Sequence, residues 1–219
     1  MESGTILMMK YKYILLDWDG NLAKTLHIWL EAYRVVLERR GIHKSDMEIA
    51  GMFGTSSMQM ELWGVKDLHE ADEEAGEEAV QMLPDVELYP DVLSTLEQLH
   101  DKGHILGLVT TSTRQSLGDL LAKYNLDKLF QVVITADDVS QHKPHPEPLL
   151  KAMEILGAIP ELTIMIGDTE KDILSAQSAG IDSVLFHSPA HSTFYNVDFL
   201  RSHKPTYSIE TFPDLLQIC

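Results

Sequence analysis

The sequence predicts an α/β protein in which a Rossmann-like parallel sheet carries helices on both faces, with an all-helical segment inserted near its start. Apolar runs alternate with amphipathic segments through the C-terminal two-thirds of the chain, and strands separated by helices in this way form parallel sheets. We expect strands near residues 11–17, 104–110, 131–135, 162–167 and 182–186, and helices near 91–102, 114–124, 147–157 and 170–179.

The first apolar run, Tyr11–Leu16, ends in Asp17-Trp18-Asp19-Gly20. Residues two apart on a strand project to the same side, so the side chains of Asp17 and Asp19 point the same way at the end of the strand, while Trp18 points to the opposite side. Gly20 permits a sharp turn. Neighbouring carboxylates cannot ionise independently, so one of them is biased toward its protonated form. The pair can therefore act as a nucleophile beside an acid, or as two ligands of a hard metal ion. A surface turn rich in Asp and Gly is the alternative.

Three later segments place polar residues where an apolar run ends or on an adjoining loop. They are Thr110-Thr111 after Ile105–Val109, Lys143 in the proline-rich loop 143–148, and Asp168 after Ile164–Gly167 with Asp172 one helical turn later. Ligands of parallel sheets bind beyond the carboxyl ends of the strands, so we expect these side chains to share one site with Asp17. Each segment alone has a structural alternative: a hydroxyl-rich helix cap, a proline turn, or an N-cap with a favourable charge in the first turn.

Residues 25 to about 83 break the alternation and show helical spacing of apolar residues. We expect one helix that starts after Thr25 as N-cap and ends at Gly41, and further helices over 46–52, 57–63 and 68–83. His27 and Trp29 belong to an apolar stripe, and we interpret them as packing residues rather than substrate-reading ones. The acidic run 70–78 is interpreted as a solvated helix face.

Composition indicates the class of partner. The chain has 219 residues, of which 44% are hydrophobic, and a formal net charge of -17, so nucleic acid and anionic membranes are not expected partners. No stretch reaches transmembrane length, and Ile6–Met9 is too short for the apolar region of a secretory signal. The single cysteine, Cys219, cannot form an internal disulfide. A reducing, cytoplasmic location is therefore expected.

Taken together and in this order, these residues resemble the haloacid dehalogenase superfamily of phosphatases. The shared pattern is Asp-x-Asp-Gly after the first strand, Thr after the second, then Lys-Pro, then Gly-Asp-x-x-x-Asp, and it spans about residues 11 to 185. The surroundings of Lys143 and Asp168 are similar to the phosphoglycolate phosphatase and pyrophosphatase branch. The resemblance implies a core domain of residues 1–24 and 85–219 and a helical cap domain of residues 25–84, with Pro84 and Pro90 at the return hinge.

The resemblance further implies a Mg²⁺-dependent phosphatase that hydrolyses a small, phosphoglycolate-like phosphate monoester through an aspartyl-phosphate. In that reading Asp17 is the nucleophile, and Asp19 is the acid for the leaving oxygen and the base for the hydrolytic water. The partner is a small phosphorylated metabolite. The oligomeric state is not indicated.

The remaining motif residues acquire roles from the same resemblance. Mg²⁺ is held by Asp17, the backbone carbonyl of Asp19 and Asp168, and Asp172 orients a metal-bound water. The phosphoryl group is held by Thr110, the backbone of Thr111 and Lys143.

Several positions depart from the family pattern. Asn21 stands where Thr or Val is usual, and Thr111 replaces a frequent Asn. Lys24 replaces a usual Asp, which reverses a charge near the pocket and could alter substrate choice or cap movement. Four histidines, His142, His145, His187 and His191, lie beside Pro and Ser in loops and are interpreted as solvated rather than as a transition-metal site.

Rival functions remain open at this point. A dehalogenase would use Asp17 but lacks an acid at the position of Asp19. A β-phosphoglucomutase shares every core residue, but the segment Arg40–Ser45 lacks the arginine–serine pattern expected there. A pyrophosphatase is a further alternative. A non-catalytic phosphate-binding regulatory module is the alternative from a different class.

Overall fold

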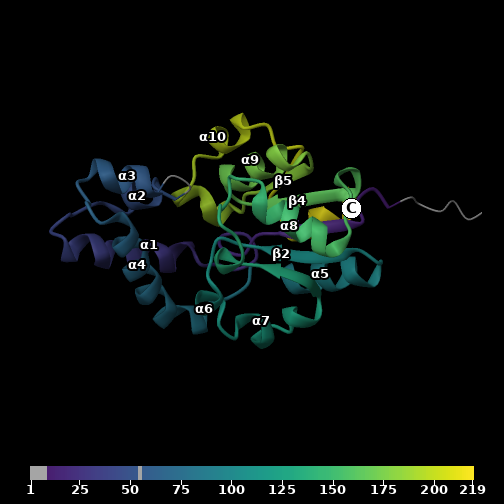
Figure 1. The fold of residues 1–219 in the computed structure, drawn as a ribbon, viewed down its shortest axis with the longest axis horizontal. Coiled ribbons are helices and arrows are strands. Elements are labelled where there is room, and N and C mark those ends of the chain that lie inside the picture. The colour runs from purple at the N-terminus through teal and green to yellow at the C-terminus, as the bar shows by residue number, and fades with distance from the viewer. Residues whose placement is uncertain (1–8, 54–55) are drawn as a thin grey trace, which may run out of the picture.

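The computed structural model describes residues 9–53 and 56–219, and the residues Ile6–Met8 of the short apolar run lie outside this range. Its centre is a six-stranded parallel sheet in the order β3-β2-β1-β4-β5-β6 (Figure 1). The strands are β1 (Tyr13–Leu16), β2 (Ile105–Val109), β3 (Phe130–Ile134), β4 (Thr163–Gly167), β5 (Asp182–Phe186) and β6 (Tyr207–Ile209). The predicted fold class and its five strands are confirmed, and β6 is an additional edge strand.

Strand β1 lies in the middle of the sheet and is buried along its whole length. Leu16 pairs with Leu108 of β2 on one side and with Ile166 of β4 on the other. Because all three strands run parallel, the residues that follow them emerge at the same edge. This register places the loops after β1, β2 and β4 side by side.

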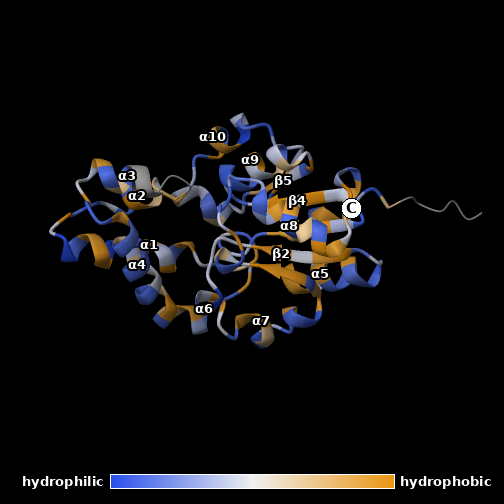
Figure 2. Ribbon diagram, viewed as in Figure 1, coloured by the Kyte–Doolittle hydropathy of each residue, from blue (hydrophilic) through white to orange (hydrophobic). Residues whose placement is uncertain are grey.

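Alternate side chains of the strands form two apolar layers. In Figure 2 the labelled strands are largely orange, which marks hydrophobic residues. Ile14 and Leu16 of β1 pack in one layer, which includes helix α5 (Val92–Asp101). Leu15 lies in the other layer, which includes α8 (Glu147–Leu156) and α9 (Glu170–Ala179). The sheet therefore has helices on both faces, as predicted.

The predicted helix 114–124 is divided in the structure into α6 (Arg114–Leu117) and α7 (Leu120–Lys123). Gly118 lies between them with φ of +47°, a conformation that glycine adopts at little cost and that ends the first helix. Two further short helices, α10 (Val197–Ser202) and α11 (Leu215–Ile218), follow β5 and β6. Single 3₁₀ turns lie at 83–85, 126–128, 136–138, 160–162, 189–193 and 212–214.

Four helices form the insertion beside the sheet, at the left of Figure 1. They are α1 (Leu26–Arg39), α2 (Asp46–Ala50), α3 (Ser56–Leu62) and α4 (Leu68–Met82). Helix α1 packs along α4, whose buried face consists of alanines. This arrangement confirms the predicted all-helical cap. The predicted cap limits, residues 25 and 84, remain a prediction.

The chain passes between sheet and cap at two adjacent places. Ala23 and Leu88 form an antiparallel bridge, the N–H of Lys24 donates to the carbonyl of Glu87 at 2.8 Å, and the N–H of Tyr89 donates to Leu22 at 2.9 Å. The Lys24 ammonium group lies 3.0 Å from the Glu87 carboxylate. The two passages are thus joined to each other by backbone hydrogen bonds and an ion pair.

Among the residues described, no helix combines the length and the apolar character needed to cross a lipid bilayer.

Candidate active site

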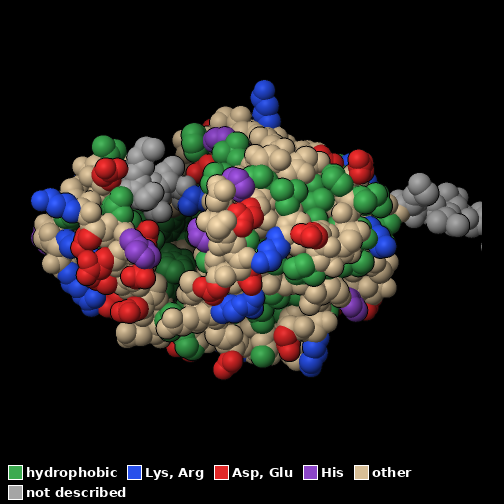
Figure 3. Space-filling model, viewed as in Figure 1, with side chains coloured by type: hydrophobic (Ala, Val, Ile, Leu, Met, Phe, Trp, Pro, Cys, Tyr) green, Lys and Arg blue, Asp and Glu red, His purple; other side chains and the backbone are tan. Residues whose placement is uncertain are grey.

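A cavity of about 850 Å³ lies between the cap and the edge of the sheet where the strands end. Figure 3 shows it as a hollow between the cap, at the left, and the rest of the molecule. The core contributes Asp17, Asp19, Thr111, Ser112, Lys143 and Asp168 to its lining, and the cap contributes Trp29, Tyr33, Phe53 and Asp72. The predicted residues at the ends of three strands therefore converge on one cavity.

Asp17 directly follows β1 and is 7% exposed. Its N–H donates to the carbonyl of Ile166 at 2.9 Å, and the buried side-chain amide of Asn21 donates to its carbonyl at 3.0 Å. Asn21, which departs from the family pattern, thus uses its side chain to fix the loop. Gly20 has φ of +68°, and a Cβ there would lie 2.1 Å from Oδ2 of Asp168. Only glycine allows these two loops to approach so closely.

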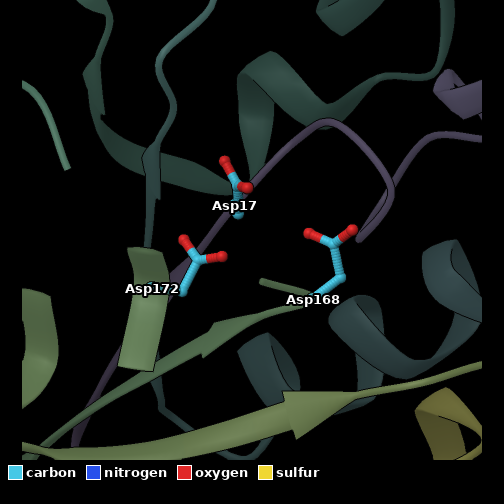
Figure 4. Close-up of side chains that lie close together, drawn as sticks. All are labelled: Asp17, Asp168 and Asp172. Carbon is cyan, nitrogen blue, oxygen red and sulfur yellow. The ribbon is translucent and has the colours of Figure 1, made fainter. Parts of the chain in front are cut away.

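Asp17, Asp168 and Asp172 form a buried cluster in which one carboxylate oxygen from each lies within 4.8 Å of the others (Figure 4). Asp172 is the third residue of helix α9, and its Oδ2 accepts from the N–H and hydroxyl of Thr169 in a capping box. Thr169, and not Asp168, is therefore the N-cap. The Asp168 carboxylate is left facing the cavity.

Lys143 lies within this cluster and is 5% exposed. Its Nζ is 2.8 Å from Oδ1 of Asp17 and 2.6 Å from Oδ1 of Asp172, and it donates to the carbonyl of Val109 at 3.0 Å. Burial lowers the pKa of Lys143, but the neighbouring Asp17 and Asp172 outweigh burial and raise it above its ordinary value. The lysine is therefore a fixed positive charge between two carboxylates.

Three carboxylates and one ammonium group leave two negative charges in a buried space. Burial raises the pKa of Asp17 to about 7, against the opposing effect of Lys143. Burial also raises the pKa of Asp168, and the charges of Asp17 and Asp172 raise it further. Such shifts mark a site where negative charge is insufficiently compensated.

The cluster fits a divalent cation with a preference for oxygen ligands. With all three carboxylates ionised its uncompensated charge is two, and Oδ1 of Asp168 is buried without a hydrogen-bond partner among the described residues. Asp172 is a poorer ligand, because one of its oxygens contacts Lys143 and the other contacts Thr169. Oxygen-only donors suit Mg²⁺ better than Zn²⁺. Asp17 and Asp168 are thus the carboxylates best placed to bind it.

The two threonines after β2 have different positions. Thr110 is 3% exposed, and its hydroxyl accepts the N–H of Ser112 at 3.0 Å. Thr111 and Ser112 line the cavity, whereas Thr110 lies behind them. The hydroxyl-rich loop is therefore where the sequence places it, with Ser112 as a lining residue that the sequence did not single out.

Asp19 lies apart from the carboxylate cluster and is held from two sides. Its Oδ1 accepts from the indole N–H of Trp29 at 2.7 Å, and its Oδ2 accepts from the hydroxyl of Ser112. Trp29 packs against the apolar core as predicted, but its ring also lines the cavity and its N–H contacts a predicted catalytic group. His27 is exposed, so its interpretation as a packing residue is wrong.

Thr25 is the residue before α1, but its side chain does not cap the helix. Its Oγ1 instead accepts the N–H of Gly20 at 3.2 Å. The predicted N-cap position is thus correct, while its hydroxyl stabilises the loop after Asp17. This loop is therefore supported both by the core and by the residue that precedes α1.

The acidic run of α4 is not uniformly solvated. Glu74 pairs with Arg40 at 2.8 Å and Glu78 pairs with Arg39 at 2.6 Å, which joins α4 to the end of α1. On the other side of the helix, Asp72, Glu73 and Glu77 line the cavity. Asp72 is half-buried and accepts from the hydroxyl of Tyr33 at 3.0 Å. The helix therefore presents an acidic wall to the site.

The segment after β5 forms a further wall that sequence reasoning missed. The hydroxyl of Tyr195 donates to Oδ2 of Asp168 at 2.7 Å. Phe194 stacks on Phe53 of the cap, with ring centroids 6.2 Å apart. No motif in the sequence indicates these contacts, because they depend on how a loop folds back over the sheet.

Two of the four histidines are not solvated. His142 and His145 are exposed as predicted, but His187 is 6% exposed and His191 is fully buried. Burial lowers the pKa of His191 to about 4, and its Nε2 lies 2.7 Å from the hydroxyl of Tyr89. His191 is a neutral packing residue within an aromatic cluster. None of the four belongs to the carboxylate cluster, which is the potential metal site in the described part of the chain.

The fold and the carboxylate cluster define a class of enzyme. Residues 14–186 match the family model of the haloacid dehalogenase-like hydrolases, and the chain belongs to this family. The resemblance seen in the sequence is thereby confirmed.

Individual curated relatives have more specific names than the family, but they match only part of the chain. The pyrophosphatases PpaX of Bacillus mycoides (strain KBAB4) and Halalkalibacterium halodurans are 42% and 40% identical to this chain over 133 residues. Each alignment covers 61% of this chain and 60% of the relative. The match thus spans about three-fifths of the length of these curated relatives.

Solved structures match over nearly the whole chain. A Lactobacillus plantarum protein assigned as a phosphoglycolate phosphatase has a TM-score of 0.85 and 27% identity, covering 96% of this chain and 100% of its own. A Thermotoga maritima protein assigned as a β-phosphoglucomutase has a TM-score of 0.70 and 25% identity, covering 94% and 99%. The same fold and cap thus occur in proteins assigned to different reactions on phosphate esters.

Proposed function

We propose that this protein is a Mg²⁺-dependent phosphatase that hydrolyses a small phosphate monoester through an aspartyl-phosphate at Asp17. The observation that carries the proposal is the position of Asp17, whose carboxylate ends the central strand, contacts Lys143 at 2.8 Å and belongs to the cluster with Asp168. A buried carboxylate held beside a fixed cation is suited to nucleophilic attack.

In the first step an oxygen of Asp17 attacks phosphorus, and the bond between phosphorus and the leaving oxygen breaks. Asp19 supplies the proton that the leaving oxygen takes up. In the second step water attacks phosphorus, its proton passes to Asp19, and the bond to Asp17 breaks to release inorganic phosphate. The two carboxylates thus alternate their roles within one cavity.

The surrounding residues stabilise the charge of the phosphoryl group. Lys143 is a fixed cation beside Asp17, and Thr111, which lines the cavity in the loop after β2, offers hydroxyl and N–H donors. Asp17, Asp168 and the Asp19 backbone carbonyl would hold Mg²⁺, and Asp172 would act through Lys143 and a metal-bound water. When bound, Mg²⁺ neutralises phosphoryl oxygens and orients the ester.

The substrate proposal rests on the names of the relatives and on the cavity. A phosphoglycolate-like ester is supported by structural neighbours assigned as phosphoglycolate phosphatases, and inorganic pyrophosphate is supported by the curated relatives. A phosphomutase remains the second candidate because of the β-phosphoglucomutase-like neighbour. Asp19 argues against a dehalogenase, and the complete charged cluster argues against a non-catalytic module. The composition supports a cytoplasmic location, with a small metabolite rather than nucleic acid or membrane as partner.

The separate roles of Asp17 as nucleophile and Asp19 as acid and base are tested with two matched variants, Asp17→Asn and Asp19→Asn. The substrate is an aryl phosphate whose leaving group needs no protonation. Asp17→Asn should form no phosphoenzyme. Asp19→Asn should lose about 10²–10⁴-fold in turnover and accumulate phosphorylated Asp17, because the base for the second step is missing. Intact mass after rapid quench measures the phosphoenzyme. Modification of any residue other than Asp17 would contradict the mechanism.

Phosphate release from a panel of esters and pyrophosphate, with Mg²⁺ and with chelator, separates the substrate candidates. Stoichiometric inorganic phosphate is expected for a phosphatase. Isomerisation of a hexose phosphate with negligible release would instead establish a mutase, and unchanged turnover in chelator would contradict the metal assignment.

A further inference from the structure

We propose that Trp29, a cap residue, is the positioning residue for Asp19, so that Asp19 can transfer its proton efficiently only when the cap is seated on the core. The proposal rests on the proposed phosphatase function and adds a residue to it. Its basis is that the two oxygens of the Asp19 carboxylate are bound by different parts of the molecule.

The core side of this arrangement is Ser112, which donates to Oδ2 of Asp19 from the loop after β2. A hydroxyl can donate to a carboxylate and can also accept from a carboxylic acid. Ser112 can therefore remain bonded to Asp19 before and after the proton is transferred. The core alone does not restrict which oxygen carries the proton.

The cap side is Trp29, one turn into helix α1, whose Nε1 donates to Oδ1 of Asp19 at 2.7 Å. An indole N–H is only a donor, so it can pair with an unprotonated oxygen but cannot accept a proton from Asp19. The bond therefore assigns the transferable proton to Oδ2. It also stabilises the negative charge that Asp19 acquires as the leaving oxygen takes that proton.

The cap helix offers a matched control at the next turn. Tyr33 lines the same cavity and packs against Trp29, with ring centroids 6.3 Å apart, but its hydroxyl donates to Asp72 and not to Asp19. Trp29→Phe and Tyr33→Phe each remove one polar hydrogen from an aromatic side chain of α1. Only Trp29→Phe removes a hydrogen bond to Asp19.

The kinetic test compares the rate of aspartyl-phosphate formation for a series of esters with leaving groups of increasing basicity, by rapid quench with saturating Mg²⁺. In Trp29→Phe we expect a loss of about 10²-fold for alkyl phosphates and a much smaller loss for 4-nitrophenyl phosphate, because loss of one donor at developing charge costs on this scale. In Tyr33→Phe we expect any loss to be equal across the series. An equal loss across the series in Trp29→Phe would overturn the proposal.

A second measurement depends neither on turnover nor on the folding of Trp29→Phe. The chain has three tryptophans, so ¹H–¹⁵N spectra contain three indole signals. We expect Asp19→Ala to move the Trp29 signal upfield by loss of its hydrogen bond, and Asp17→Asn to leave the Trp29 signal in place. An unmoved set of signals in Asp19→Ala would overturn the proposal.

A failure of the proposed phosphatase function can be distinguished from a failure of the role proposed for Trp29. Wild-type protein that hydrolyses no ester of the series, but whose indole signal responds to Asp19→Ala, would refute the proposed function alone. Wild-type protein that hydrolyses esters while Trp29→Phe retains the wild-type leaving-group dependence would refute the role of Trp29 alone.

Discussion

Asp168 is the residue on which the metal proposal depends most directly. Its Oδ2 accepts from Tyr195, and its Oδ1 is buried with no hydrogen-bond partner in the described part of the chain. An ionised oxygen in that position is costly unless a cation neutralises it. Bound Mg²⁺ would therefore stabilise the folded chain as well as prepare it for catalysis.

This coupling predicts a pH-dependent stabilisation by Mg²⁺. The pKa of Asp17 is raised by burial to about 7, above its ordinary value, so the metal-free folded chain holds a proton that the unfolded chain releases. Its contribution to stability is full below pH ~4 and is lost as the pH rises through about 7. Mg²⁺ binds the deprotonated carboxylate, so its effect should be larger at pH 8 than at pH 5.5.

Thermal unfolding with Mg²⁺ and with chelator measures this effect. At 100 times Kd the stabilisation is about 2.7 kcal/mol, which corresponds to roughly 5–10 °C in Tm for a chain of this size. Asp168→Asn is the control and should fold but lose most of the shift, together with Mg²⁺-dependent turnover. A Tm increase of equal size at both pH values would contradict the linkage.

At the scale of elements, the loop and 3₁₀ turn after β5 connect the carboxylate cluster to the cap. Tyr195 binds Asp168, and Phe194 stacks on Phe53 of the cap. A hydrogen bond of this kind fixes the orientation of a metal ligand, and its loss typically lowers metal affinity by about 10–100-fold. We therefore expect Tyr195→Phe to raise the Mg²⁺ concentration needed for half-maximal activity by such a factor.

A Mg²⁺ titration of activity and of Tm measures the effect of Tyr195→Phe. Tyr207→Phe is a suitable comparison, since Tyr207 hydrogen-bonds to Lys10 and Tyr11 at the far end of the sheet. Its Mg²⁺ dependence should equal that of the wild type. If Tyr195→Phe also retains wild-type affinity, the tyrosine does not support the metal ligand.

The sequence allowed the elements of the core to be predicted because their patterns are local. Apolar runs mark buried parallel strands, and the rule that strands end at a common edge brings Asp17, Lys143 and Asp168 together. Strand β6 was not predicted because it has three residues, of which only Ile209 is buried. The break at Gly118 escaped because one glycine is also tolerated within a helix.

The contacts that complete the site could not be predicted in the same way. Trp29 has the spacing of a packing residue on α1, and its role depends on where the cap lies over the core. Tyr195 and His191 depend on a loop that folds back over the sheet, and such loops carry no periodic pattern. Asp72 and Glu74 belong to the same acidic run of α4, and the direction each faces decides that Asp72 lines the cavity while Glu74 pairs with Arg40.

At the scale of the whole molecule, the net charge of -17 opposes the approach of anionic substrates. Helix α4 of the cap adds three acidic side chains that line the cavity, Asp72, Glu73 and Glu77. At 0.1 M salt, repulsion between exposed charges that lie more than about 10 Å apart is largely screened. We therefore expect kcat/KM for an anionic ester to rise, by about threefold, between 10 and 150 mM KCl at saturating Mg²⁺.

Initial rates at low substrate concentration measure this salt dependence. A zwitterionic ester such as phosphocholine has less net charge, so its kcat/KM should change less. A fall in kcat/KM with salt for the anionic ester would show that local attraction in the cavity outweighs the field of the whole chain.

The paired passages between cap and core have a mechanical consequence. Leu22–Lys24 and Glu87–Tyr89 are held to each other by backbone hydrogen bonds and by the Lys24–Glu87 ion pair. Two strands joined in this way bend as one ribbon, whereas two independent linkers would let the cap twist and slide. A movement of the cap relative to the core would therefore be restricted to a swing about a single axis that runs across the ribbon. Such a swing would return the indole of Trp29 along the same arc to the same carboxylate oxygen.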